Sequence, residues 1–203
     1  MPRLRSLTVD EFDPELRAML DADHKSQREL RPMSVRAHHP ELAKAYVRYS
    51  AAAKQCAVLS TRLRELLRLR IAFHNQCRSC MAMRYADAVD AGVSEGLVCS
   101  LEKPQEAADL TAAERLALRY ADLLATNHLA IDDAMYGQLK QLFSEKELVE
   151  LGTWCAICVG FGRLSATWDM TEDLPERFRD DSDRPVTPWG PDAWVTGSVG
   201  KAS

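Results

Sequence analysis

The spacing of apolar residues constrains this sequence more than any other feature. Through the first 170 residues, apolar side chains recur at three- and four-residue intervals, turn signals are sparse, and no convincing run alternates strictly between apolar and polar residues. Intervals of three or four residues place side chains on one face of an α-helix, whereas a half-buried strand would alternate. The sequence therefore predicts an all-α protein.

Local signals predict where the helices begin and end. The expected starts carry proline at the first helical position, a serine, threonine or aspartate cap, or a capping box. They are Pro14, Pro40, Ser60-Thr61, Thr111, Asp132 or Asp133, and Ser144. The helix after Ser60 should reach about His74, and its apolar face would carry Leu63, Leu66, Leu67 and Ile71. Another helix should begin at Cys77 and end at Ala91-Gly92, where glycine suits the left-handed cap position.

The composition changes near residue 171, since four of the nine prolines and three of the nine glycines fall in the last 33 residues. We expect residues 1–170 to form a single helical domain and residues 171–203 to form an extended or partly disordered tail. Trp189 and Trp194 leave two interpretations open. Either the tail lies against the body or a neighbouring subunit, or these are loose apolar residues in a mobile end.

Charge and hydrophobicity argue against several classes of partner. A net charge of −4 gives no long-range attraction to nucleic acid or to an anionic membrane. A solvated face or subunit salt bridges explain the arginine cluster better than a nucleic-acid site. The cluster consists of Arg62, Arg64, Arg68 and Arg70. The longest apolar run, 151–161, falls well short of the ~20 residues that cross a bilayer, so no membrane span is expected.

Cysteine usage and the N-terminus indicate a reducing compartment. No apolar stretch long enough for a signal peptide follows Met1 to Arg5. Six cysteines without an export signal are more consistent with reduced thiols in a cytosol than with a disulfide scaffold. We expect a cytoplasmic protein in which any disulfide is made and broken in use.

Cys77 and Cys80 form the pair of residues with the clearest chemistry. They are three positions apart at the start of an expected helix, so they share one face and can reach disulfide distance. Unpaired backbone N–H groups, with Arg78 and Arg84 nearby, would stabilise a thiolate. Two buried helix thiols, or half of a zinc site, are the alternatives. Glu65, twelve positions before Cys77, favours redox chemistry because a carboxylate near a thiol can accept its proton.

The chain resembles the alkyl hydroperoxidase D-like branch of the carboxymuconolactone decarboxylase family. The resemblance is carried by Leu63 to Ala72, by Asn75 to Cys80 and by Ala88 to Ser94, and it extends over roughly residues 30–168. It implies an all-α helical bundle assembled as trimers or hexamers. It also implies that Cys80 is the peroxidatic cysteine, that Cys77 is the resolving one and that Glu65 belongs to a proton relay. Some members are reduced by a lipoyl-bearing partner.

One departure from the family pattern concerns the proton relay. The family usually has histidine four positions after the second cysteine, where this chain has Arg84, and some members have histidine where this chain has Ser79. Arginine cannot shuttle protons at neutral pH, but it can hold a thiolate or bind an anionic substrate. His74 is either a substitute base or a helix-end histidine without a chemical role.

We expect a thiol-dependent peroxidase or disulfide oxidoreductase that reduces a small hydroperoxide and is restored by an external thiol, with no bound cofactor or metal. The alternative is a decarboxylase, lyase or isomerase of a small carboxylated compound, with Arg84 binding the carboxylate. A third possibility is a catalytically silent zinc or assembly module. A second pair, Cys155 and Cys158, is expected to pack in the core rather than to act as another redox pair or as part of a zinc site.

Overall fold

The computed structural model describes residues 2–179, 185–190 and 193–196. Helices account for most of these residues and two three-residue strands for the rest of the regular structure, so the all-α prediction is confirmed. The α-helices are α1 (Pro14–Leu20), α2 (Gln27–Arg36), α3 (Pro40–Gln55), α4 (Thr61–His74), α5 (Arg78–Ala82), α6 (Ala86–Asp90), α7 (Glu95–Cys99), α8 (Ala112–Thr126), α9 (Asp133–Leu139) and α10 (Glu145–Thr167). The strands are β1 (Met83–Tyr85) and β2 (Trp194–Thr196). Short 3-10 segments lie at Val9–Glu11, Ala22–His24, Ser100–Glu102, His128–Ala130 and Glu176–Phe178.

The predicted helix starts are confirmed by their capping hydrogen bonds. Ser60 accepts a bond from the Leu63 backbone N–H at 3.1 Å, and Asp132 accepts one from Met135 at 2.9 Å. Complete capping boxes begin at Thr111 and Ser144. Pro14 and Pro40 stand at the first positions of α1 and α3. These signals are local, which is why the sequence alone located them.

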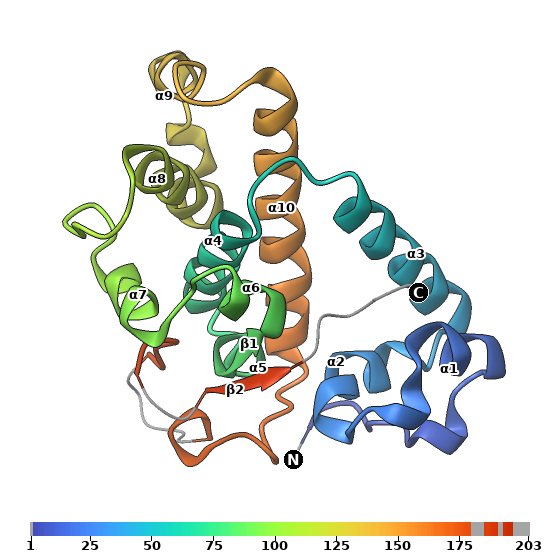
Figure 1. The fold of residues 1–203 in the computed structure, drawn as a ribbon. Coiled ribbons are helices and arrows are strands. Elements are labelled where there is room, and N and C mark those ends of the chain that lie inside the picture. Colours follow the sequence, from blue (N-terminus) through green and yellow to red (C-terminus); the bar gives the residue numbers. More distant parts are fainter. Residues whose placement is uncertain (1, 180–184, 191–192, 197–203) are drawn as a thin grey trace.

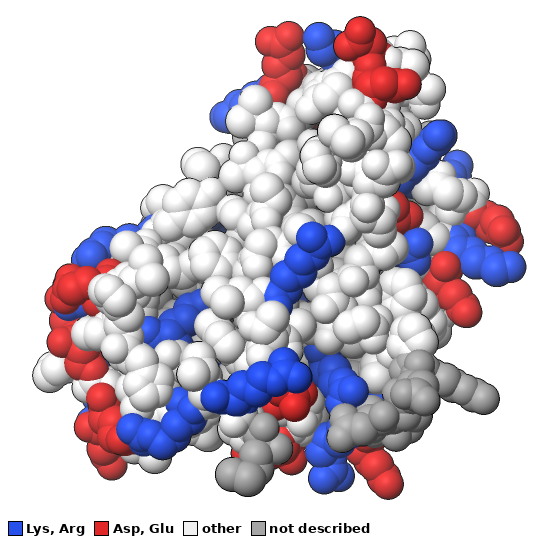
Figure 2. Space-filling view, turned by 180° about the vertical axis from the view of Figure 1, so that it is seen from behind, with Lys and Arg blue, Asp and Glu red and all other residues white. Residues whose placement is uncertain are grey.

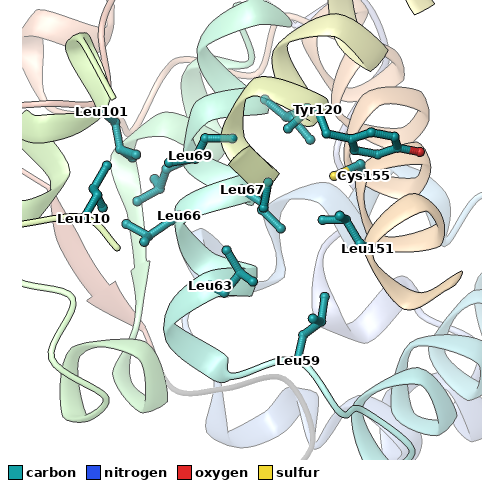
Figure 3. Close-up of a cluster of buried hydrophobic side chains, with 14 of the residues drawn as sticks. Leu59, Leu63, Leu66, Leu67, Leu69, Leu101, Leu110, Tyr120, Leu151 and Cys155 are labelled. Atoms are coloured by element: carbon teal, nitrogen blue, oxygen red, sulfur yellow. The ribbon is translucent and has the colours of Figure 1, made fainter. Parts of the chain in front are cut away.

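Helix α4 lies between α8 and α10 at the centre of the molecule (Figure 1). Leu66, Leu67 and Leu69 are fully buried although they point in different directions around the helix. Figure 3 shows Leu66 and Leu69 facing Leu101 and Leu110, while Leu67 points toward the group formed by Tyr120, Leu151 and Cys155. The buried apolar surface of α4 is therefore wider than the single face that the sequence predicts, because other elements enclose this helix on several sides.

The first three helices form a separate layer with its own core (Figure 1). Leu16 and Leu20 of α1 pack against Leu30 of α2 and Ala43 of α3. Helix α3 then leads across the molecule to α4. This arrangement places α2 and α3 opposite the central helices α4 and α10, and a cavity lies between the two groups.

The helix predicted from Cys77 to Ala91 is wrong, because β1 divides it into α5 and α6. Strand β1 pairs in parallel with β2, with Met83 opposite Trp194 and Tyr85 opposite Thr196. The partner strand is more than a hundred residues away in the sequence, so no local signal could reveal the pairing. The predicted end at Gly92 is confirmed, since this glycine has a φ of 86°.

The described part of the tail packs on the helices. Phe178 is completely buried beside Met81 and Ala82 of α5, and the Trp189 ring lies 4.9 Å from the ring of Phe73. Of the two interpretations of Trp189, contact with the body is confirmed. The backbone of Trp194 lies in β2. Residues 180–184, 191–192 and 197–203, on which the rest of the tail prediction falls, lie outside the described residues.

The arginine cluster of α4, predicted to form a solvated face or subunit salt bridges, forms ion pairs with residues of the same chain. Arg62 pairs with Glu114 at 2.6 Å, Arg68 with Glu65 at 2.6 Å and Arg70 with Asp122 at 2.7 Å. These ion pairs lie within one chain. Because α4 is central, its polar side chains must find partners on neighbouring elements or on the same helix.

Among the described residues, α10 is the one helix whose length and mean hydropathy of 1.2 would suffice to cross a membrane. In the structure it packs along α4 and α8 and contributes Leu151 and Cys155 to the main core. Its other side carries exposed apolar residues, including Val149 and Leu164.

Candidate functional site

Cys77 and Cys80 are joined by a disulfide, with their Cα atoms 5.2 Å apart. Cys77 is the residue before α5 and is 1% exposed, so its sulfur is closed off from solvent. Cys80 is only partly buried and forms part of a cavity wall. The two sulfurs thus differ in access, which gives a small molecule in the cavity a route to Cys80 alone.

The cavity has a volume of about 300 Å³ and lies between the N-terminal helices and the central ones. Helices α2 and α3 form one wall, and α4, α10 and the β1 segment form the other. Most of the lining is apolar, as expected for a small-molecule site. Apolar lining residues include Leu30, Met33, Val47, Ala72, Ile157 and Phe161.

Glu65 and Arg68 form a buried ion pair in the wall beside Cys80. Both carboxylate oxygens of Glu65 accept hydrogen bonds from Arg68, from Nε at 2.6 Å and from Nη2 at 2.7 Å. Arg68 Nη1 donates to the Cys80 carbonyl at 2.7 Å. Burial by itself would lower the pKa of Arg68, but the charge and hydrogen bonds of Glu65 raise it above its usual range. Arg68 is therefore a fixed cation that connects Glu65 to the disulfide segment.

Tyr85 and Cys158 complete this end of the cavity. The Arg68 guanidinium stacks over the Tyr85 ring with its carbon 4.9 Å from the ring centroid. Burial raises the pKa of Tyr85 and of Cys158 to about 12 each, so both groups are protonated at neutral pH. Cys155, one helical turn before Cys158, is fully buried in the core. Core packing is thus confirmed for Cys155, whereas Cys158 reaches the cavity.

Part of the chain is similar to a known protein family. Residues 40–123 match the family model described as "Carboxymuconolactone decarboxylase family". The match covers less than half of the chain, so it shows a similarity of this segment to the family. The segment contains Glu65, Arg68, Cys77 and Cys80, together with all of α3, α4 and β1. The predicted family resemblance is confirmed.

Two relatives are uncharacterized proteins of Mycobacterium tuberculosis, from strains CDC 1551 / Oshkosh and ATCC 25618 / H37Rv. Each is 42% identical over 89 residues, which is 43% of this chain and 31% of the relative. The match therefore spans less than a third of the length of these relatives.

A solved structure is similar over most of the fold. It is an uncharacterized peroxidase-related protein from Ralstonia eutropha JMP134 with an alkylhydroperoxidase AhpD core. The TM-score is 0.67 at 16% identity, and the match covers 88% of this chain and 94% of the other. This likeness confirms the predicted alkyl hydroperoxidase D-like helical fold.

Arg84, which replaces the histidine usual in the family, does not reach the cavity. It is 1% exposed and binds Glu95 through Nε at 2.8 Å and Nη2 at 3.1 Å. It also donates to the carbonyl oxygens of Met81 at 2.8 Å and Pro188 at 2.7 Å. With its donors engaged in this way, Arg84 joins β1 to the tail, and the prediction that it holds a thiolate or an anionic substrate has no support in this geometry.

His74 does not line the cavity either, and its side chain is engaged with α8. Its Nε2 is 2.7 Å from Asp122 Oδ1 on α8, and Arg70 contacts the same carboxylate. Burial by itself would raise the pKa of Asp122, but the hydrogen bonds from His74 and Arg70 lower it. Of the two interpretations of His74, the structure favours a structural helix-end residue over a substitute base.

Sequence reasoning missed Arg68, Tyr85 and Arg36 as cavity residues. Arg68 stands three positions after Glu65, which is the spacing of a helical ion pair, and that signal could have found it. Tyr85 and Arg36 had no comparable signal. In the described part of the chain, no group of three or more His, Cys, Asp and Glu side chains converges as a metal site would require.

Proposed function

We propose that this chain is a thiol-dependent peroxidase or disulfide oxidoreductase that works through Cys77 and Cys80. The observation that carries the proposal is the difference in access between the two bonded sulfurs. Cys80 borders an apolar cavity, and Cys77 is closed behind it. A peroxidatic cysteine must meet its substrate, whereas a resolving cysteine needs only to reach its partner.

The proposed cycle starts from the reduced pair. The Cys80 thiolate attacks one oxygen of a hydroperoxide, an S–O bond forms, the O–O bond breaks, and the leaving alkoxide takes a proton to become an alcohol. Cys80 is then a sulfenic acid. The Cys77 sulfur attacks it, the S–S bond forms and water leaves. An external dithiol, such as a lipoyl group on a partner protein, returns the disulfide to two thiols by exchange.

The Glu65–Arg68 pair supports this chemistry. The Arg68 cation is held beside the Cys80 backbone, where it favours a thiolate over a neutral thiol. Glu65 keeps the guanidinium in position and supplies a carboxylate in the same cavity that can receive the thiol proton through a water molecule. In this proposal Glu65 receives the proton, while Arg68 stays protonated and acts only through its positive charge.

A peroxide-consumption assay with dihydrolipoamide as reductant tests the function. We expect turnover by the natural sequence, loss of turnover in Cys80→Ser, and unchanged turnover in the control Cys56→Ser, whose cysteine is exposed and does not line the cavity. Full activity in Cys80→Ser would contradict the proposal.

A second candidate is a decarboxylase, lyase or isomerase acting on a small carboxylated compound. The family match at residues 40–123 favours this candidate, because the family is named after a decarboxylase. Such chemistry would not need the disulfide pair. Turnover of a carboxylated lactone that survives in Cys77→Ser/Cys80→Ser would support this candidate over the peroxidase.

We also propose that the chain acts in the cytoplasm as a homotrimer or homohexamer. Exposed apolar side chains lie on α10 and α3, among them Val149 at 71% exposure and Leu42 at 66%. Figure 2 shows a face whose middle is formed largely by residues other than Lys, Arg, Asp and Glu. Such surfaces are often buried by association. The mass in solution measured by light scattering tests the oligomer, and a monomer at micromolar concentration would contradict it.

A further inference from the structure

The cavity contains more positive than negative side chains. Five basic residues line it, namely Lys25, Arg36, Lys54, Arg64 and Arg68. Three acidic residues do so, and each is already engaged. Glu65 binds Arg68, Asp87 binds Lys54 at 2.8 Å, and Glu29 closes the capping box at Ser26. Positive charge without a carboxylate partner therefore remains in a largely apolar space.

Arg36, at the end of α2, carries part of this uncompensated charge. Its guanidinium carbon lies 4.8 Å from the centroid of the Tyr46 ring, 5.1 Å from that of Trp168 and 5.4 Å from that of Phe161. Nη2 donates to the Ser165 hydroxyl at 3.3 Å, and Nε is buried without a hydrogen-bond partner. No carboxylate in residues 2–179, 185–190 and 193–196 makes an ion pair with Arg36.

The surroundings of Arg36 are suited to binding an anion. Three aromatic rings surround the guanidinium and hold it in place, so the side chain loses little further freedom when an anion binds. Burial lowers the pKa of Arg36, yet arginine stays charged at neutral pH. A carboxylate can accept two parallel hydrogen bonds from a guanidinium, which a neutral alcohol or a methyl group cannot.

The residues that line the cavity extend from Arg36 to the end of the cavity that contains Cys80. Ser165 and Cys158 lie seven residues apart on α10, which corresponds to about 10 Å along the helix axis. Met33, Ile157 and Phe161 line the cavity with them. A ligand that places its charged group at Arg36 can therefore extend an apolar chain through the cavity toward Cys80.

We propose that the cavity binds an elongated aliphatic monocarboxylate, with the carboxylate on Arg36 and the apolar chain directed toward Cys80. The chemical consequence of this inference rests on the proposed function. With that function, the preferred hydroperoxide carries a carboxylate at one end and its peroxy group on the apolar chain. Since α2 precedes residues 40–123, the residue that selects this ligand class lies outside the segment that matches the family.

Calorimetric binding to the resting disulfide form tests the proposal without any turnover. The probes are decanoate and decanol, which differ in charge at similar length. We expect decanoate to bind about tenfold or more tightly than decanol, as a charge-assisted hydrogen bond would provide. Arg36→Gln should remove that preference, and Arg36→Lys should retain part of it. The control Arg119→Gln changes an exposed arginine on α8 and should bind as the natural sequence does.

Three results would overturn the inference. The first is equal affinity of the natural protein for decanoate and decanol, which needs no variant and so does not depend on whether Arg36→Gln folds. The second is a preference for decanoate that persists in a folded Arg36→Gln protein. The third is a preference that disappears only in Arg64→Gln, which would assign the anion to the arginine stacked on Trp154. Carboxylate binding without peroxide consumption would instead refute the proposed function and leave this inference standing.

Discussion

Replacement of Glu65 by glutamine should destabilise the protein strongly. Glu65 is 3% exposed, and its partner Arg68 is 8% exposed, so the pair has little contact with water. Glutamine can accept one hydrogen bond from Arg68 but supplies no charge, and the guanidinium would remain buried and uncompensated. Breaking a buried pair by removing one partner costs about 3–5 kcal/mol. We expect the free energy of unfolding of Glu65→Gln to fall by an amount in this range.

Urea denaturation followed by circular dichroism measures this change, with the disulfide kept oxidised in all samples. Arg68→Met should cost a similar amount because it leaves the carboxylate unpaired. The double variant Glu65→Gln/Arg68→Met should lose clearly less than the sum of the single variants, because no buried charge remains. Glu11→Gln, at an exposed pair with Arg5, is the control and should change stability little. Additive losses in the double variant would refute the view that the two residues act as one unit.

Three further predictions follow from the same structure. Because burial raises the pKa of Cys158 to about 12, iodoacetamide at pH 8 should label Cys80 of the reduced protein and leave Cys158 unlabelled in a mass-spectrometric map; labelling at Cys158 first would be contrary to this account. The pKa of Asp122 is lowered in the folded state, so its contribution to stability is present above its unfolded pKa and is lost as the pH falls through its folded pKa. Asp122→Asn should therefore lower the melting temperature at pH 7 and flatten its decline below about pH 4, and an unchanged decline would count against the assigned pKa shift. Trp189→Ala should lower the melting temperature because Trp189 packs on Phe73, and an identical melting curve would argue against that contact.

Helix starts and the identity of the cysteine pair could be predicted because their signals are local. A cap residue contacts a backbone N–H three positions later, as Ser60 contacts Leu63, and the cysteines are three positions apart. The likeness of residues 63–80 to the family pattern depends on the same short stretch. Signals of this kind involve residues only a few positions apart, so both the residues and their spacing can be read in the sequence. The fold class and the candidate cysteine pair could therefore be predicted.

The partners of the charged residues could not be predicted, since they depend on packing between distant segments. Arg84 is enclosed by Glu95 and by the Pro188 carbonyl, which belongs to the tail. The strand that interrupts the predicted helix after Cys77 exists because that same tail supplies β2. The surroundings of Arg36 likewise depend on the packing of α2 against α10, which supplies Phe161 and Ser165. A charged residue that becomes buried needs an interaction partner, but only the folded structure determines which residue that partner is.

Trapping of the sulfenic acid tests the central claim most directly. Reduced Cys77→Ser protein is mixed with one equivalent of an organic hydroperoxide in the presence of dimedone, and the adduct is located by mass spectrometry. The account predicts one adduct per chain on Cys80 with release of the alcohol, while the natural sequence under the same conditions forms the Cys77–Cys80 disulfide instead. Unreacted peroxide, or an adduct at another cysteine with Cys80 unmodified, would contradict it.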